Sequence, residues 1–190
     1  CDQGISPTIW QQSRYPAELR NKIEVIHEGI DTEIVKPDSG AWVEINGQRL
    51  QAGDEIVTYV ARNLEPYRGF HTFMRSLPKL QALRPNAKVI IVGGDEVSYG
   101  KRLPEGQTYR QRYCAEVQDR VDWSRVFSVG KLPYADYLKV LQISAAHVYL
   151  TYPFVLSWSM LEAMAAGCLL VASDTAPVKE VIEDGQNGLL

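Results

Sequence analysis

The sequence predicts an α/β fold with a doubly wound, mostly parallel sheet. From Ile56 onward, short apolar runs alternate with segments of helical periodicity, a rhythm typical of parallel sheets. The length of 190 residues fits one domain, and a 45% hydrophobic and 23% charged composition is that of a globular protein. Ahead of the main sheet, VEINGQRL alternates apolar and polar residues around Asn46-Gly47, which predicts a small surface hairpin within residues 39–53.

Composition excludes several functional classes. The net charge of −3 gives no support for nucleic-acid binding, and no apolar run is long enough to span a bilayer. The three cysteines Cys1, Cys114 and Cys168 lie far apart, without disulfide or zinc spacing, which favours a reducing cytoplasm. Cys168 opens an apolar run, and we expect it to behave as a small buried hydrophobic residue.

The beginning of the chain differs in character from the rest. Residues 1–21 contain two prolines and no sustained periodicity, so we expect a connecting segment that packs through Trp10 and Tyr15. Residue 1 is not methionine, and residues 188–190 read as the start of a strand. We therefore expect a portion of a longer protein, with one domain over residues 22–190 cut at its C-terminal end.

Each later element has its own signal. Phe70, Phe73, Met74, Leu77 and Leu80 share one face of a helix. Pro133 suits the opening of another helix. In chain order, we expect strands at 22–27, 56–61, 88–94, 125–129, 146–150 and 168–173, and helices at 69–83, 109–122, 133–144 and 158–166, with a short helix ending at 180–184.

Residues 150–172 carry the main sequence signal for a functional site. Ser157 is a plausible N-cap, and Gly167 stands where a left-handed C-terminal cap is wanted. Glu162 is the single charge between Trp158 and Ala166. One interpretation places Glu162 on a solvated helix face. The other places it near the carboxyl ends of the strands, where ligands collect in open parallel sheets.

The run SMLEAMAAGCLLVAS resembles the signature helix of the family-four retaining glycosyltransferases (glycosyl transferases group 1), which have the GT-B fold. That helix carries two glutamates eight positions apart, and the second binds the ribose of a nucleotide-sugar. Glu162 matches the second glutamate, whereas Phe154 stands at the position of the first, which contacts the donor sugar in that family. The run IEVIHEGIDTEIVKP resembles the hinge that opens the C-terminal Rossmann-like domain of these enzymes.

Arg62 ends the first main strand and Arg68 stands six residues on, just before the first helix, in ARNLEPYRGF. Arginine presents a fork of donors that suits phosphate oxygens, and Arg62 and Arg68 could together hold a diphosphate without a metal. The alternative is a surface salt bridge between one of them and Glu65 or another nearby acid. The resemblance favours the first interpretation, because this family binds the donor diphosphate with a basic pair at this place.

The resemblance implies further donor contacts. Backbone groups after another strand would hold the nucleobase, and amides at the start of the signature helix would support a phosphate. These residues are Gly130, Lys131 and Leu132, and Ser157, Trp158, Ser159 and Met160. No catalytic residue is assigned, and a histidine at the end of a strand, His27, is expected to be structural.

The expected function is that of the nucleotide-sugar-binding domain of a retaining glycosyltransferase. It would transfer a sugar from a nucleoside-diphosphate donor to a sugar, lipid or glycan acceptor held against a missing N-terminal domain. We expect no metal, no cofactor and no nucleic-acid partner, and no turnover by this portion alone. The expected location is the cytoplasm, with the inner membrane surface as an alternative reached through the missing part. A nucleotide-sugar epimerase of the same architecture and a non-catalytic association domain remain alternatives.

Overall fold

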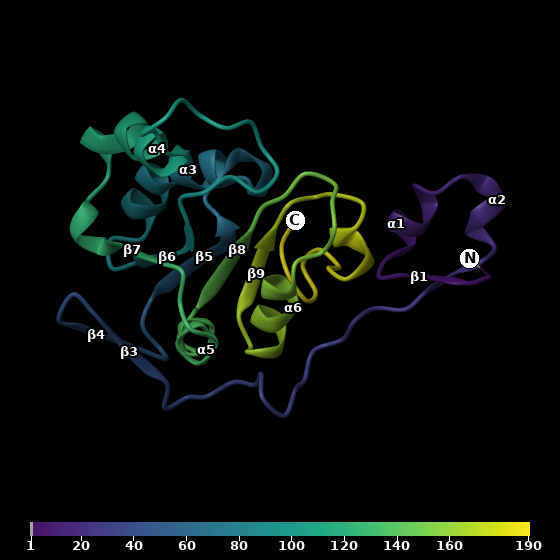
Figure 1. Ribbon diagram of the computed structural model, residues 1–190. Helices are drawn as coiled ribbons and strands as arrows, with labels where there is room; N and C mark the ends of the chain where they lie inside the picture. Colours follow the sequence, from purple (N-terminus) through teal and green to yellow (C-terminus); the bar gives the residue numbers. More distant parts are fainter. Residues whose placement is uncertain (1) are drawn as a thin grey trace.

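The computed structural model describes residues 2–190 and is built around a five-stranded parallel sheet (Figure 1). Its strands, in spatial order, are β7 (Val126–Gly130), β6 (Lys88–Gly94), β5 (Ile56–Asn63), β8 (Ala146–Tyr149) and β9 (Leu169–Ala172). The chain starts in the central strand β5, moves outward through β6 and β7, and then returns to β8 on the other side. The predicted doubly wound sheet is confirmed, and its order reverses between β5 and β8, where ligands bind in such sheets.

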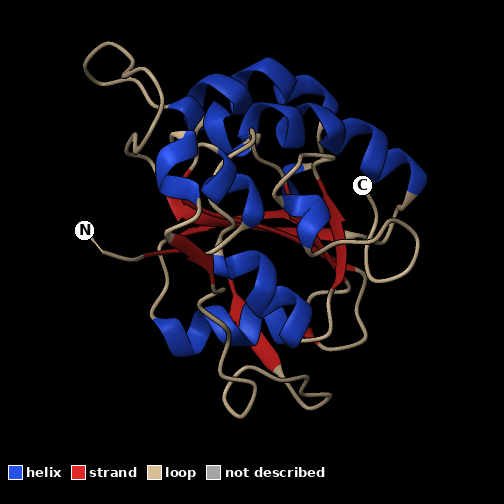
Figure 2. Ribbon diagram, turned by 90° about the vertical axis from the view of Figure 1, so that its right-hand side faces the viewer, coloured by secondary structure: helices blue, strands red, loops and turns tan. Residues whose placement is uncertain are grey.

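Helices cover both faces of the sheet, as Figure 2 shows. On one face lie α3 (Phe70–Leu83) and α4 (Tyr109–Val117), and on the other lie α5 (Tyr134–Gln142) and α6 (Trp158–Ala165). The predicted apolar face of α3 is confirmed, because Phe70, Phe73, Met74 and Leu77 are all buried. Within residues 2–190, no helix combines the length and apolar character needed to cross a membrane.

Two predicted helices are shorter in the structure. The helix expected over 109–122 ends at Val117. Two 3₁₀ turns follow it, η2 (Gln118–Arg120) and η3 (Trp123–Arg125). The side chain of Asp122 accepts a hydrogen bond from the Ser124 amide and so begins a new turn. The last helix is only a 3₁₀ turn, η4 (Val178–Glu180). A further 3₁₀ turn, η1 (Pro66–Arg68), precedes α3.

The predicted hairpin is present as β3 (Trp42–Ile45) and β4 (Gln48–Gln51). Asn46 and Gly47 adopt positive φ angles of 52° and 74°, as a two-residue turn of this type requires. The hairpin is not wholly on the surface, however, which corrects our expectation. Leu50 is fully buried and belongs to a core cluster with Phe127 and Val140.

The N-terminal segment is more regular than predicted. It holds β1 (Gly4–Ser6), α1 (Ile9–Ser13) and α2 (Ala17–Arg20), and β1 pairs in parallel with β2 (Ile23–Val25). Figure 1 shows this unit at one side of the sheet, joined to it by the long segment that precedes β3. Glu180 accepts hydrogen bonds of 2.7 Å from the Ile9 and Trp10 amides and ties the unit to η4. Tyr15, expected to pack, is 46% exposed, and Cys1 lies outside the described residues.

Candidate functional site

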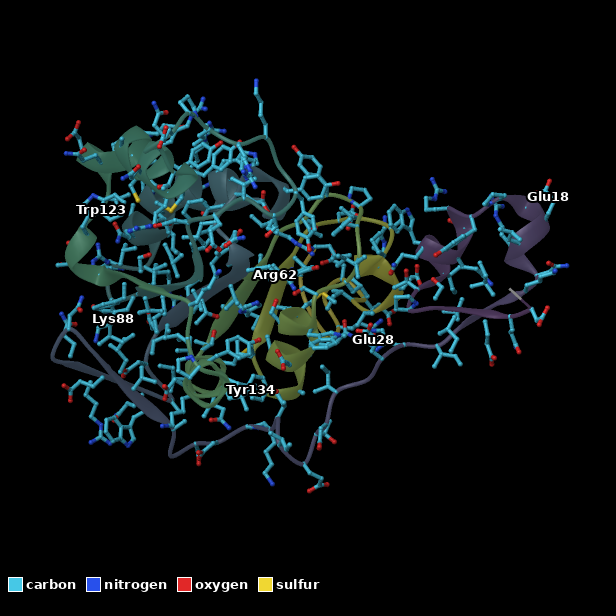
Figure 3. All side chains as sticks on the ribbon, in the orientation of Figure 1. Glu18, Glu28, Arg62, Lys88, Trp123 and Tyr134 are labelled. Atoms are coloured by element: carbon cyan, nitrogen blue, oxygen red, sulfur yellow. The ribbon has the colours of Figure 1, made fainter. Side chains whose placement is uncertain are left out.

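A cavity of about 380 Å³ opens at the carboxyl ends of β5 and β8; we call it the strand-end cavity. Its walls come from the loops after these two strands, from the start of α6 and from the linker at Glu28. Figure 3 shows Arg62 near the middle of the molecule, above Tyr134 of α5 and to one side of Glu28. The cavity lies at the switch point of the sheet and contains both predicted phosphate-binding side chains, Arg62 and Arg68.

The guanidinium group of Arg68 is held firmly by the protein. Its Nη1 donates to the hydroxyls of Tyr149 and Thr151, at 3.2 and 3.1 Å, and to the Val155 carbonyl at 3.3 Å. The aromatic rings of Tyr99 and Phe154 lie 5.7 and 5.1 Å from its central carbon, within the range of cation–π attraction. A charged group is therefore fixed at the wall of the cavity.

Arg62 differs from Arg68, because its side chain is exposed and has no hydrogen-bond or ion-pair partner among residues 2–190. The alternative in which Glu65 pairs with one of the arginines is wrong. Glu65 is 1% exposed and accepts hydrogen bonds of 2.8–3.2 Å from the amides of Ser98, Tyr99 and Gly100. Since this carboxylate is satisfied by backbone donors, it leaves both guanidinium groups available to a ligand.

Glu162 is buried, so its interpretation as a solvated helix residue is wrong. Its two carboxylate oxygens accept hydrogen bonds from the hydroxyls of Tyr134 at 2.8 Å and Tyr137 at 2.6 Å. Burial and the Glu162 carboxylate raise the pKa of Tyr134 to about 12 and hold the pKa of Tyr137 far above its ordinary value. Glu162 does not line the strand-end cavity, and the protein's own hydroxyls occupy the place expected for a ribose diol.

The start of α6 reaches the cavity, and Ser157 is its N-cap, as predicted. Three of the four amides expected to support a phosphate already have partners. The Ser157 amide donates to the Tyr149 hydroxyl, the Ser159 amide to the Ser157 hydroxyl, and the Met160 amide to the Ser157 carbonyl. The indole of Trp158 donates to the Glu28 carboxylate. A phosphate would therefore have to exchange partners with most of these amides.

The segment expected to hold the nucleobase lies outside the strand-end cavity. Gly130 ends β7 with a φ of 69°, and Lys131 forms an ion pair of 2.5 Å with Glu96. Leu132 lines a separate cavity of about 550 Å³ between β3 and α5. That larger cavity contains neither of the two predicted phosphate-binding arginines, so it does not compete as the candidate site.

Several residues of this site have no direct signal in the sequence. Tyr99 stands in the loop after β6, whose amides donate to Glu65, and its ring lies beside Arg68. Tyr149 lies in β8, and a predicted strand at 146–150 does not indicate its contact with Arg68. His27 accepts a hydrogen bond from the Gly29 amide and is not part of the cavity wall. In the part of the chain that the structure describes, no group of three His, Cys, Asp or Glu side chains could hold a metal ion.

Comparison with known proteins places this geometry in a family. The family model for glycosyl transferases group 1 matches residues 42–190. A second model, for the glycosyl transferase family 4 group, matches residues 1–35. The chain is 25% identical to spore coat protein SA of Bacillus subtilis over an alignment of 195 positions, which covers 94% of this chain and 47% of that protein. It is also 25% identical to a GDP-mannose-dependent alpha-(1-6)-phosphatidylinositol monomannoside mannosyltransferase of Mycobacterium tuberculosis over 171 residues, with 88% and 42% covered.

Solved structures share this fold. A TarM variant from S. aureus, crystallised with Fondaparinux, alpha-GlcNAc-glycerol and UDP, matches the whole chain over 33% of its own length, with a TM-score of 0.74 and 18% identity. The chain spans about half the length of the curated relatives it matches. The predicted Rossmann-like architecture of a GT-B C-terminal half is confirmed. By the match over residues 42–190, the chain belongs to the glycosyl transferases group 1 family.

Proposed function

We propose that this domain binds the nucleoside-diphosphate sugar donor of a retaining glycosyltransferase, with Arg62 and Arg68 on the diphosphate. The observation that carries the proposal is that both arginines line one cavity at the switch point of the sheet. Neither arginine forms an ion pair within residues 2–190. An anion with two phosphates complements the charge of two guanidinium groups that form no ion pair, and arginine's fork of donors suits phosphate oxygens.

The arginines also suit the chemistry of sugar transfer. Negative charge develops on the departing nucleoside diphosphate, and fixed cations stabilise that charge without having to reorganise. Arg68 is already fixed by three acceptors, so its orientation costs little when the donor binds. We propose that the two guanidinium groups serve in place of a metal ion, and that no cofactor takes part.

In this proposal, Glu162 binds the donor ribose after one of its present partners is displaced. A ribose hydroxyl can reach its carboxylate only by replacing a tyrosine hydroxyl, and Tyr134 is the more exposed of the two partners. We propose that Tyr134 yields to the ribose while Tyr137 stays in place. The nucleobase would then lie toward the backbone of Gly130, Lys131 and Leu132.

The acceptor belongs to the same proposal. We propose that a sugar, lipid or glycan acceptor binds against a second domain, so that residues 1–190 bind nucleotide without turnover. The mannosyltransferase that matches this chain is named for a GDP-mannose donor, and the TarM variant was crystallised with UDP, which supports a nucleoside-diphosphate donor here. A cytoplasmic location, at or near the inner membrane surface, is also a proposal.

Isothermal titration calorimetry with UDP, GDP and ADP tests the proposed function. Wild-type protein should bind at least one of the three, and Arg62→Ala should weaken that binding. Arg120→Ala is the matched control, because Arg120 is also an exposed arginine but does not line the cavity. Absence of binding by all three nucleotides, or equal losses in the two variants, would contradict the proposal.

A further inference from the structure

An aromatic ring occupies the place where the family resemblance leads one to expect a carboxylate. Phe154 stands eight residues before Glu162, and its ring centre lies 5.1 Å from the central carbon of the Arg68 guanidinium. Tyr99 lies 5.7 Å from the same carbon, and the Tyr99 and Phe154 ring centres are 5.0 Å apart. Two aromatic rings from distant segments therefore meet at one cation.

The donors of Arg68 are divided between the protein and the cavity. All three of its hydrogen bonds to protein acceptors come from Nη1. Among residues 2–190, the Nε and Nη2 groups have no hydrogen-bond partner, although Arg68 lines the cavity. These two groups form the edge of the guanidinium plane that suits a bidentate oxyanion. The protein holds one side of the group and leaves the other side free.

The second ring is held in place by its own network. The Tyr99 amide donates to both oxygens of the buried Glu65 carboxylate, at 3.2 Å each. The flanking amides of Ser98 and Gly100 donate to the same carboxylate. The loop after β6 is thereby attached to the end of β5, next to η1, which carries Arg68. Glu65 thus contributes to the position of the Tyr99 ring without pairing with the arginine.

We propose that Phe154 and Tyr99 are positioning residues, which keep the free edge of Arg68 turned into the strand-end cavity. Aromatic rings attract the guanidinium group through their π-electrons but carry no net charge. A carboxylate in contact with the same cation would instead form an ion pair with it and offset part of its charge. The ring orients Arg68 and leaves its whole charge for the ligand. The benefit to donor binding rests on the proposed function, whereas the restraint on Arg68 does not.

The test compares Phe154→Leu with Phe154→Tyr, which keeps a ring. The first readout is the ¹⁵Nε NMR signal of Arg68 and its order parameter, in protein without ligand. The second is the affinity for UDP, GDP and ADP by calorimetry. Tyr152→Leu is the matched control, since Tyr152 packs on Tyr67 but is not one of the rings over Arg68.

Phe154→Leu should lower the order parameter of the Arg68 side chain, whose three hydrogen bonds remain, and weaken nucleotide binding by about fivefold, in line with the strength of one cation–π contact. Phe154→Tyr and Tyr152→Leu should leave both readouts near wild type. Tyr99→Leu repeats the test from a second segment, in case Phe154→Leu does not fold. Its expected effect has the same direction and is smaller, because its ring is farther from the cation.

The two readouts separate the inference from the proposed function. An Arg68 signal that stays as rigid as wild type in folded Phe154→Leu would overturn the positioning role, whatever the nucleotide affinities are. A more mobile Arg68 in Phe154→Leu, combined with no nucleotide binding even by wild type, would support the positioning role and count against the proposed function. Full mobility of Arg68 in the wild-type protein would also overturn the inference.

Discussion

The surroundings of Arg68 and of Glu162 show two different ways to hold a charged group near a site. Arg68 lines the strand-end cavity, and within residues 2–190 only its Nη1 donates to protein acceptors. Glu162 is buried, and both of its oxygens are taken by tyrosine hydroxyls. The cationic region is therefore ready for an anion, whereas Glu162 must first release a tyrosine hydroxyl before it can bind a ligand.

Because of this difference, the two regions should contribute unequally to the free energy of ligand binding. Preorganised groups contribute to affinity with little cost in ordering, so most of the affinity should come from the arginines. The carboxylate exchanges one hydroxyl for another, and such an exchange has a small net free energy. The predictions below test whether the two regions really differ in this way.

The largest expected effect is on the stability of the central sheet, which carries both regions. His147 in β8 is fully buried, and its Nδ1 lies 2.9 Å from the Thr58 hydroxyl of β5. Burial lowers the pKa of His147 from 6.5 to about 4. Between these two pKa values, His147 takes up a proton in the unfolded chain but not in the native protein. The free energy of unfolding therefore falls as the pH drops from about 6.5 to about 4. The free energy of unfolding should lose about 3 kcal/mol over this range.

Urea denaturation at pH 7, 5 and 4 measures that loss. His147→Asn, which keeps a polar group toward Thr58, should show a shallower decline than wild type. His27→Asn is the matched control, because His27 is exposed and its loss should leave the profile unchanged. Identical pH profiles for wild type and His147→Asn would show that this histidine does not couple the two strands to acid.

The second prediction compares the two arginines within the cationic region. Arg68→Gln should lower the affinity for a nucleoside diphosphate by about 30-fold, because hydrogen bonds to charged groups contribute about 2 kcal/mol. Arg62→Gln should cost about fivefold, since the exposed Arg62 has to be ordered when the ligand binds. Calorimetry on both variants measures the ratio. A larger loss for Arg62→Gln would contradict the view that anchoring decides the contribution.

The smallest effect is expected at the carboxylate. Tyr134→Phe frees one oxygen of Glu162 without changing its charge, so nucleotide affinity should rise by about threefold. Tyr137→Phe removes the other, more buried hydroxyl and should lower the stability of the protein instead. Calorimetry and urea denaturation on the two variants make a matched pair. A weaker affinity in Tyr134→Phe would indicate that Tyr134 contacts the donor rather than giving way to it.

Much of the fold could be predicted because its signals are local. The strand β6 is a run of apolar β-formers, Ser157 caps α6, and Gly167 takes the left-handed conformation with a φ of 86°. The Asn46-Gly47 turn likewise carries its own conformational preference. Such features depend on a few neighbouring residues, and the sequence is sufficient for them.

The rest of the site depends on contacts between distant segments. No local pattern states that Glu65 binds the loop at Tyr99, or that Phe154 packs on Arg68. The sequence placed Arg62 and Arg68 correctly at a strand end, where topology alone brings ligand-binding residues together. It could not show that two tyrosines of α5 would satisfy Glu162, because that contact depends on how α5 packs against α6.

A crystal structure of the protein with bound UDP, GDP or ADP would show whether the two arginines hold the donor diphosphate. We expect the diphosphate to lie in the strand-end cavity, within hydrogen-bond distance of the free edge of Arg68 and of Arg62. A diphosphate bound elsewhere on the molecule, with both guanidinium groups left without a ligand, would contradict it.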